Sequence, residues 1–403
     1  MRLYFSLSHL SAGFIAVLVG FTSSAAILFQ AASAVHASTA ELASWILALG
    51  VGVSISCIGL SLYYRMPILT AWSTPGAALL ASSLTGLTLS QAVGAFLFSA
   101  FLTVLAGVSG CFERFMSRIP SELASAMLAG ILLHFGLNVF LALQNAHLMI
   151  LIMLSAYILG KRFYPRYVLP IVLLLGITVA AFQGEIRMDL VHWGFSSPVF
   201  TWPEFSWFAL CSVGLPLFVI TMTSQNIPGL TVLRAAGFHP PVSKLVSIMG
   251  MGNLLMAPFG GFSLNLAAIT AAICANEEAD PIASRRYRAT ISAGLFYLLM
   301  GLFSTTIVAL FAAFPSNLVL AVAGMALFGT LASNLKEALE NDKQREAAIL
   351  TFLVSASGLD FLGFSAAFWG LLTGILSSLI IKPGLVSQSV FSPVKEGAEL
   401  LNE

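Results

Sequence analysis

The chain has 403 residues, of which 58% are hydrophobic and only 9% are charged, and its formal net charge at pH 7 is +1. Soluble domains carry roughly 25% charged residues, so this composition excludes an ordinary soluble protein and favours a protein that lies in lipid. The small net charge gives no indication of nucleic-acid binding. The cysteines have no metal-ligand or CxxC spacing, so we expect neither a metal nor a cofactor; they are Cys57, Cys111, Cys211 and Cys274.

The predicted elements are apolar segments separated by short polar stretches. The first, 9–32, follows Arg2 and has about the 20 residues that a spanning helix needs, so we interpret it as an uncleaved helix and not as a signal peptide. Lipid offers the backbone no hydrogen-bond partners, so the segments should be helical unless protein covers them. The others are 41–62, 67–85, 90–110, 121–140, 146–162, 166–183, 207–232, 242–257, 258–276, 287–312, 316–334, 344–357 and 360–381.

Two segments, 67–85 and 258–276, differ from the rest because each opens with a proline and a stretch rich in glycine, serine or threonine. We expect an extended start in each, with helices beginning near Ser73 and Ser263. If both segments cross the membrane, 17 of the 18 Lys and Arg residues lie on the cytoplasmic side, and without them only 11 do. Because basic residues prefer cytoplasmic loops, we predict fourteen segments, with both termini in the cytoplasm.

The polar stretch 184–206 divides these segments into two halves of seven, which must then have opposite orientations. The predicted fold is an all-α polytopic membrane protein with 14 transmembrane segments as two inverted 7-segment repeats. Segments 3 and 10 are expected to be broken, each a short strand plus a half-helix. The expected divisions are an N-terminal repeat, an external linker, a C-terminal repeat and a cytoplasmic tail, at 1–183, 184–206, 207–382 and 383–403.

The half-helices of the broken segments indicate a binding site, because a helix N-terminus presents unpaired N–H groups and a partial positive charge. Two such ends near the membrane midplane would bind an anion without a buried Lys or Arg. Ser73, Thr74, Ser263 and Asn265 are candidates for this role or for plain helix caps. The full set of candidate substrate-binding residues is Ser23, Trp72, Ser73, Thr74, Gly76, Thr221, Thr223, Gln225, Asn226, Phe262, Ser263 and Asn265.

The polar run from Thr221 to Asn226 interrupts an apolar segment, so it must face a cavity or bond to other helices. His134 lies well inside a segment and is either a proton-coupling residue or a structural histidine. Glu122 is the other proton-coupling candidate, although it also suits the first turn of a helix. The sequence has no hydrolase, metalloprotease or nucleotide-binding motif, and we predict that the protein is not an enzyme.

Two stretches, Thr221–Arg234 and Ala257–Thr270, resemble the BenE family of benzoate:proton symporters. The resemblance implies an inner-membrane protein with the fold of the uracil permeases, in which segments 1–4 and 8–11 form a core domain and segments 5–7 and 12–14 form a gate domain. It also makes a homodimer through the gate helices plausible. The glutamates by which uracil permeases bind nucleobases are replaced here by Gln225, Asn226 and Asn265.

The resemblance and the predicted anion site together favour a proton-coupled secondary transporter that imports benzoate or a similar small aromatic carboxylate by alternating access. Its expected partners are this organic anion, protons and the lipid bilayer, with no nucleic acid. The alternative is a nucleobase or inorganic-anion transporter on the same scaffold. A passive channel and a membrane enzyme are weaker alternatives, because broken helices around a closed site suit alternating access and catalytic groups are missing.

Overall fold

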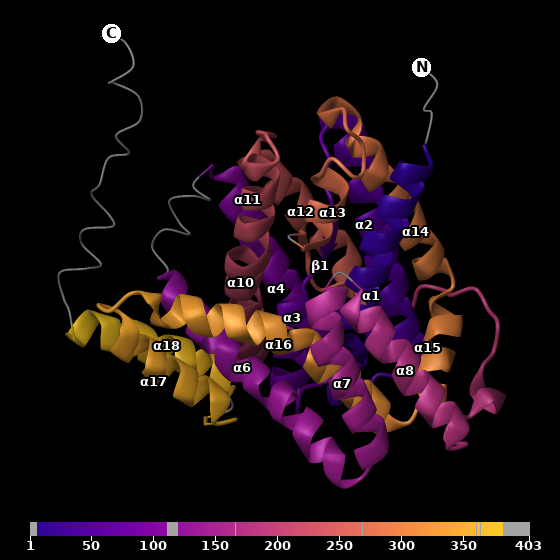
Figure 1. Cartoon of the computed structure of the whole chain (residues 1–403). Helices are drawn as coiled ribbons and strands as arrows, with labels where there is room; N and C mark the ends of the chain where they lie inside the picture. The colour runs from indigo at the N-terminus through magenta and orange to yellow at the C-terminus, as the bar shows by residue number, and fades with distance from the viewer. Residues whose placement is uncertain are drawn as a thin grey trace.

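The structure is a computed structural model, and it describes residues 6–110, 120–165, 167–267, 269–359, 361, 362 and 364–381. It is mostly helical, with one small sheet of strands β1 (Thr70–Trp72) and β2 (Leu264–Leu266) (Figure 1). The predicted tail and the loop with Arg114 and Arg118 lie outside the described residues. The helices are α1 (Leu7–Ala34), α2 (Thr39–Tyr64), α3 (Thr74–Ser83), α4 (Leu89–Val108), α6 (Ser121–Leu141), α7 (His147–Phe163), α8 (Val168–Phe182), α9 (Trp207–Ala209), α10 (Leu215–Thr221), α11 (Ile227–Ala235), α12 (Val242–Met256), α13 (Ile269–Ala275), α14 (Tyr287–Leu302), α15 (Ser304–Ala313), α16 (Ser316–Glu340), α17 (Arg345–Ala356) and α18 (Ala366–Ile381).

The described part of the chain contains 7 helices that are long and apolar enough to cross a membrane, or 8 if α14 and α15, which meet at a 68° bend, form one span. The protein is therefore a multi-pass membrane protein. The shorter apolar helices α8 and α18 are additional. Fewer helices meet these criteria of length and hydropathy than the fourteen segments that we predicted, because several of the predicted segments are short, bent or partly extended.

The two unusual segments are broken, as predicted, and they meet each other. β1 and β2 pair antiparallel, with Trp72 opposite Leu264 and Thr70 opposite Leu266. α3 then begins at Thr74, close to the predicted start. The prediction for the second helix was wrong: α13 begins at Ile269, and not near Ser263, because the residues after Ser263 form β2 and complete the backbone hydrogen bonds of β1.

Residues 207–235 form a single run of helix, α9 to α11, that is interrupted by two π-helical turns, η3 (Leu210–Gly214) and η4 (Met222–Asn226). A proline follows each turn by two residues, at Pro216 and Pro228. Proline lacks an N–H and clashes with the carbonyl four residues earlier, which a wider turn avoids. The second turn contains most of the predicted polar run, and π turns often occur at functional sites.

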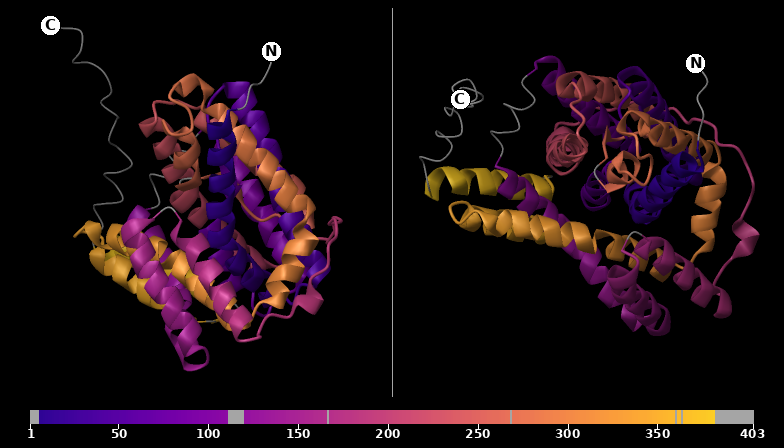
Figure 2. Two further views of the ribbon diagram at one scale, coloured as in Figure 1. Left: turned by 45° about the vertical axis from the view of Figure 1, so that its right-hand side comes forward. Right: turned by 45° about the horizontal axis from the view of Figure 1, so that its top comes forward.

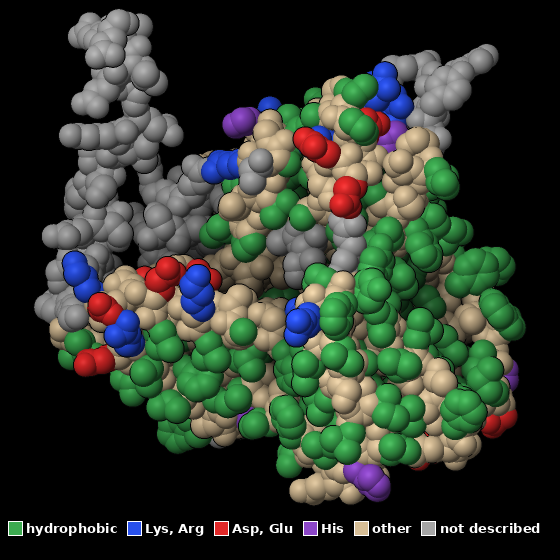
Figure 3. Space-filling view, viewed as in Figure 1, with side chains coloured by type: hydrophobic (Ala, Val, Ile, Leu, Met, Phe, Trp, Pro, Cys, Tyr) green, Lys and Arg blue, Asp and Glu red, His purple; other side chains and the backbone are tan. Residues whose placement is uncertain are grey.

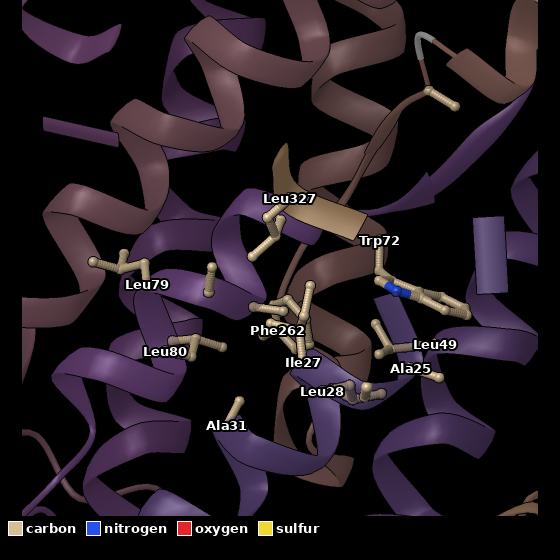
Figure 4. Packing of buried hydrophobic residues seen from close by; sticks show 14 of the residues in the cluster. Ala25, Ile27, Leu28, Ala31, Leu49, Trp72, Leu79, Leu80, Phe262 and Leu327 are labelled. Atoms are coloured by element: carbon tan, nitrogen blue, oxygen red, sulfur yellow. The ribbon is translucent and has the colours of Figure 1, made fainter. Parts of the chain in front are cut away.

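The helices pack in two groups. In the first, α1 contacts α3 and α14, α2 contacts α14, and α4 contacts α12; in the second, α6 contacts α16 and α17, and α17 contacts α18. The right-hand view of Figure 2 shows the second group, with α7 and α8, as a layer along one side of the first. Where the groups meet, Ile27, Leu80, Phe262 and Leu327 are buried in one apolar cluster (Figure 4).

Most of the charged side chains in Figure 3 lie at the top of the molecule and on its left side, with a few near the centre and at the lower right, while hydrophobic side chains cover most of the remaining face. Large apolar residues such as Ile55, Leu255 and Ile380 are 67%, 73% and 77% exposed. A soluble surface would not expose side chains of this kind in such number, whereas lipid accommodates them.

Candidate functional site

A cavity of about 440 Å³ lies where the two strands give way to their helices. Both packing groups contribute to its wall, the first through α1, β1, α3, η4, α11, α13 and α14, the second through α6 and α16. Its lining residues are Gly20, Ser23, Ser24, Ala71, Trp72, Thr74, Pro75, Ser125, Thr223, Ser224, Gln225, Ile227, Pro228, Ala267, Thr270, Tyr297, Ala326, Thr330, Ser333, Asn334 and Glu337.

Five of the predicted binding residues line this cavity: Ser23, Trp72, Thr74, Thr223 and Gln225. Residues from three separate stretches of sequence are thus brought together around one space. The other predicted residues do not line it, and all but Gly76 have a buried side chain; they are Ser73, Gly76, Thr221, Asn226, Phe262, Ser263 and Asn265.

Ser73 serves as the N-cap of α3. Its Oγ accepts the Gly76 N–H at 2.9 Å, and its carbonyl accepts the Ala77 N–H at 2.8 Å. Its own N–H donates to the Ser263 carbonyl at 3.1 Å. Pro75 has no N–H, so the Thr74 amide is the only backbone donor in this first turn that the described hydrogen bonds leave free for a ligand.

Two asparagines hold β2 in place from either side. Asn226 Oδ1 accepts the Leu266 N–H at 2.9 Å, and Asn253 accepts the Leu264 N–H at 2.5 Å while donating to the Leu264 carbonyl at 3.0 Å. Nearby, the Thr221 and Ser263 hydroxyls are 2.9 Å apart. These buried polar side chains supply the partners that a strand inside a membrane protein needs.

Phe262 and Asn265 also lie away from the cavity. Phe262 packs between Trp45 and Phe96, with ring centroids 6.5 and 5.9 Å apart. Asn265 donates from Nδ2 to the Ser263 carbonyl at 3.1 Å, and its buried Oδ1 has no partner in the described residues. Neither side chain can therefore reach a ligand in this cavity without a rearrangement.

The aromatic wall of the cavity consists of Trp72 and Tyr297. The rings meet edge to face, with centroids 5.6 Å apart, and Trp72 Nε1 donates to Ser24 Oγ at 2.8 Å. Gly20 is needed beside them, because a Cβ there would lie 2.8 Å from the Tyr297 hydroxyl oxygen. A fixed aromatic wall beside polar groups suits a ligand that has a flat apolar part and a polar part.

α16 also contributes to the wall of this cavity, which we did not predict from the sequence. Thr330, Ser333, Asn334 and Glu337 line the cavity and follow one another at spacings i, i+3, i+4 and i+7, which place them on one face of a helix. This polar stripe was visible in the sequence. Among the described lining residues Glu337 alone has a formal charge at neutral pH, and it is exposed near the C-terminal end of α16.

The two predicted proton-coupling residues do not line this cavity. Glu122 lies in the first turn of α6, as predicted, and its Oε1 accepts from Asn341 Nδ2 at 2.7 Å. His134 lies further along α6 and lines a separate cavity of about 320 Å³.

The sequence of residues 4–380 matches the model of the BenE family, the benzoate membrane transport proteins. The chain belongs to this family. It is 46% identical to the inner membrane protein YdcO of Escherichia coli K12, over 91% of this chain and 93% of that protein. It is 40% identical to the benzoate membrane transport protein of Acinetobacter baylyi, over 93% of this chain and 95% of that protein.

Membership confirms the predicted family and places the chain among membrane transporters, not enzymes. It also supports a multi-pass inner-membrane protein. Solved structures with the same fold include the transmembrane domain of the cyanobacterial bicarbonate transporter BicA, with a TM-score of 0.55 at 13% identity over 94% of this chain and 98% of that one. Another is the murine anion transporter Slc26a9 in its inward-facing state, with a TM-score of 0.57 at 12% identity over 94% of this chain and 69% of that one.

Proposed function

We propose that this BenE family member is a proton-coupled secondary transporter that imports benzoate or a similar small aromatic carboxylate. The observation that carries the proposal is the cavity at the strand ends. Its wall pairs the aromatic rings of Trp72 and Tyr297 with the Gln225 amide, the Thr223 and Ser23 hydroxyls and the free Thr74 N–H. The ring of a benzoate ion needs an aromatic or apolar surface, and its carboxylate needs hydrogen-bond donors.

In this proposal the carboxylate lies toward Thr74 and Gln225. The N-terminus of α3 adds partial positive charge there, so the site needs no buried Lys or Arg. The described lining residues include none. A carboxylate in place of Gln225 would repel an anionic substrate, which separates this cavity from one designed for a neutral nucleobase.

We also propose that the chain has fourteen segments as two inverted repeats, with the first packing group as core domain and the second as gate domain. The support is the antiparallel pairing of β1 with β2, each followed by a short helix, which relates two broken segments as an inverted pair. Alternating access would then move α6 and α16 relative to α3 and η4, and would open the cavity to either side. Both termini are proposed to lie in the cytoplasm, and a homodimer would form through the gate helices.

Proton coupling is tested by uptake of labelled benzoate into proteoliposomes. Uptake should exceed the equilibrium level when the lumen is more alkaline than the bath, and a protonophore should abolish the excess. Uptake that only equilibrates would indicate a channel or uniporter. Absence of benzoate uptake, with uptake of bicarbonate or chloride instead, would favour the inorganic-anion alternative, which the fold shared with BicA and Slc26a9 makes the most relevant competitor.

A further inference from the structure

The second cavity, of about 320 Å³, lies near the C-terminal ends of α3 and α6, whereas the substrate cavity lies near their N-terminal ends. Its wall combines residues from both packing groups and is rich in hydroxyls. The polar side chains in this wall include Ser82, Thr85, His134, Ser212, Ser355 and Ser365. Ser82, Thr85 and His134 are exposed, whereas Ser212 and Ser355 are buried. Polar groups at membrane depth are costly unless they face water, a ligand or one another, so a cavity of this composition suits a polar occupant.

One buried hydroxyl of this wall is unsatisfied. Ser355 is 3% exposed, and its Oγ has no hydrogen-bond partner in the described residues. A serine in a transmembrane helix normally bonds to a carbonyl of its own helix, as Thr351 does to Ala347 one turn earlier. A buried hydroxyl without a partner costs stability. The Ser355 Oγ lies against Gly370 of α18, so its side chain has to rotate before the hydroxyl meets a group bound in the cavity.

The two cavities lie along one seam between α3 and α6, which are in contact. On α3, Pro75 lines the first cavity and Ser82 the second; on α6, Ser125 lines the first and His134 the second. At about 1.5 Å per helical residue, each pair is separated by roughly 10–14 Å. The helices at this seam also carry apolar side chains that are fully buried or nearly so, among them Leu79, Leu80 and Leu128.

A pair of serines in the wall of the second cavity connects the two packing groups. The Ser365 N–H donates to Ser212 Oγ at 3.2 Å, and Ser365 Oγ donates to the Ser212 carbonyl at 2.9 Å. Ser212 belongs to η3 in the first packing group, and Ser365 immediately precedes α18 in the second. The two groups are therefore joined on this side.

We propose that the second cavity is an outer vestibule, a binding site that holds the substrate carboxylate before it passes along the α3–α6 seam to the inner cavity. This inference rests on the proposed function and its orientation. His134 has the only imidazole among the described residues of the vestibule wall, and its ring N–H donates to one oxygen of the carboxylate. The Thr85 hydroxyl is exposed and donates to the remaining carboxylate oxygen, because the Ser82 and Ser365 hydroxyls already donate to the Leu79 and Ser212 carbonyls.

The test compares transport from outside with binding at the inner cavity. In cells that express His134→Gln, the KM for uptake of external benzoate should rise about tenfold, because a hydrogen bond to a charged group is lost. The Kd of the purified variant for benzoate and the maximal uptake rate should stay within about twofold of the parent, because the inner cavity is intact. His147→Gln is the matched control: that residue is exposed at the start of α7 and does not line the vestibule.

An unchanged KM in His134→Gln, or a Kd that rises as much as the KM, would contradict the proposal that the second cavity is a vestibule. If the parent protein does not transport benzoate at all, the proposed function fails as well, so the two failures are distinguishable. A second measurement does not depend on His134. In a variant whose 4 native cysteines are replaced, Thr85→Cys should react with a membrane-impermeant external thiol reagent, and external benzoate should slow the reaction. Labelling that benzoate does not slow would also contradict the proposal.

Discussion

Gln225 and Asn226 are neighbours in η4, yet their side chains meet different surroundings. Asn226 is 2% exposed and its Oδ1 is occupied by the Leu266 N–H, whereas Gln225 lines the cavity beside Thr223. In the sequence the two amides are equivalent candidates for binding. The structure separates them, because only an amide with free donors in the cavity can bind a substrate without disturbing β2.

Gln225→Ala should therefore weaken transport and leave the fold intact. Loss of a hydrogen bond to a charged group costs roughly 1.5–3 kcal/mol, so the KM for benzoate should rise about tenfold to a hundredfold. Gln225→Glu should be worse still, because it places a second negative charge against the carboxylate. Uptake kinetics in proteoliposomes provide the measurement.

Gln144→Ala is the control for this prediction, since Gln144 is exposed in the turn after α6 and does not line the cavity. Thermal unfolding of all three variants in detergent should match the parent to within a few degrees. Normal uptake by Gln225→Ala at low benzoate concentration would show that the cavity is not where the carboxylate binds.

At the residue scale the sequence predicted part of this cavity for physical reasons. Trp72, Thr74 and Gln225 stood out because they follow an unusual break or interrupt an apolar helix. Tyr297 and Glu337 did not, because each lies in an otherwise regular helix and becomes part of the cavity only through packing. Ser73 and Asn226 were also predicted to bind the substrate. In the structure their side chains instead accept hydrogen bonds from the backbone N–H groups of Gly76 and Leu266.

Among the elements, β2 depends most directly on side chains. The Leu264 N–H and carbonyl both form hydrogen bonds with the Asn253 side chain, and the Leu266 N–H donates to Asn226. Asn253→Ala should therefore destabilise the protein by roughly 1–3 kcal/mol, because buried backbone groups lose their partners. Resistance to thermal or detergent unfolding should fall, while the KM of the protein that remains folded should be close to that of the parent.

Asn145→Ala offers a control of the same chemistry, because Asn145 is exposed next to the start of α7. A variant Asn253→Asp should retain the acceptor for the Leu264 N–H but lose the donor to its carbonyl, and should be at least as unstable as Asn253→Ala because it also buries a charge. Parental stability in Asn253→Ala would mean that water replaces the side chain, and that β2 is less enclosed than the structure describes.

The first turn of α1 is held by a hydrogen bond from His9 to Asp280, which lies in the loop after α13, outside the helices that could cross the membrane. His9 Nε2 lies 2.8 Å from Asp280 Oδ2, and the Ile282 N–H donates to Asp280 Oδ1 at 2.8 Å. Burial raises the pKa of Asp280, but the Ile282 N–H, the His9 hydrogen bond and the charges of His9 and Arg285 together bring it below its ordinary value.

A lowered carboxyl pKa contributes stability that is complete above the unfolded pKa, about 4, and is lost as the pH falls through the folded pKa. Asp280→Asn should accordingly be less stable than the parent at neutral pH, and the difference should shrink below about pH 4. Unfolding midpoints measured across pH 3–7 provide the check. A difference that is constant with pH would show that the charge of Asp280 contributes nothing to the attachment of α1.

The starts of α3 and α13 differ in how well the sequence predicts them. The start of α3 followed from Ser73, Thr74 and Pro75, which are an N-cap, the first helical position and a proline that needs no N–H partner. The later start of α13 had no such signal. The residues from Ser263 to Leu266 are compatible with helix or strand, and they become a strand because β1 offers them backbone partners from a segment nearly 200 residues earlier in the chain.

At the scale of the whole molecule, the two cavities place the barrier of the proposed transport cycle. The side of the substrate cavity carries exposed Glu337, while on the vestibule side Ser212 and Ser365 join the two packing groups. In the proposed orientation, we predict that this serine pair keeps the outer side closed. Composition and charge placement predicted two halves of opposite orientation, but they carried no information on which side is closed, since that depends on contacts between segments.

A disulfide at this junction would hold the two groups together. Each of Ser212 and Ser365 already contacts the backbone of the other, so their replacement by cysteines in a background without the 4 native cysteines should allow a bond to form. Oxidised Ser212→Cys/Ser365→Cys should bind benzoate with about the parental Kd, because the inner cavity is untouched, but its uptake should fall at least about tenfold because the outer side cannot open. Reduction should restore uptake, and either single-cysteine variant should be insensitive to oxidant. Full uptake by the oxidised protein, with the cross-link verified by mass spectrometry, would show that transport does not require these two groups to separate at the serine pair.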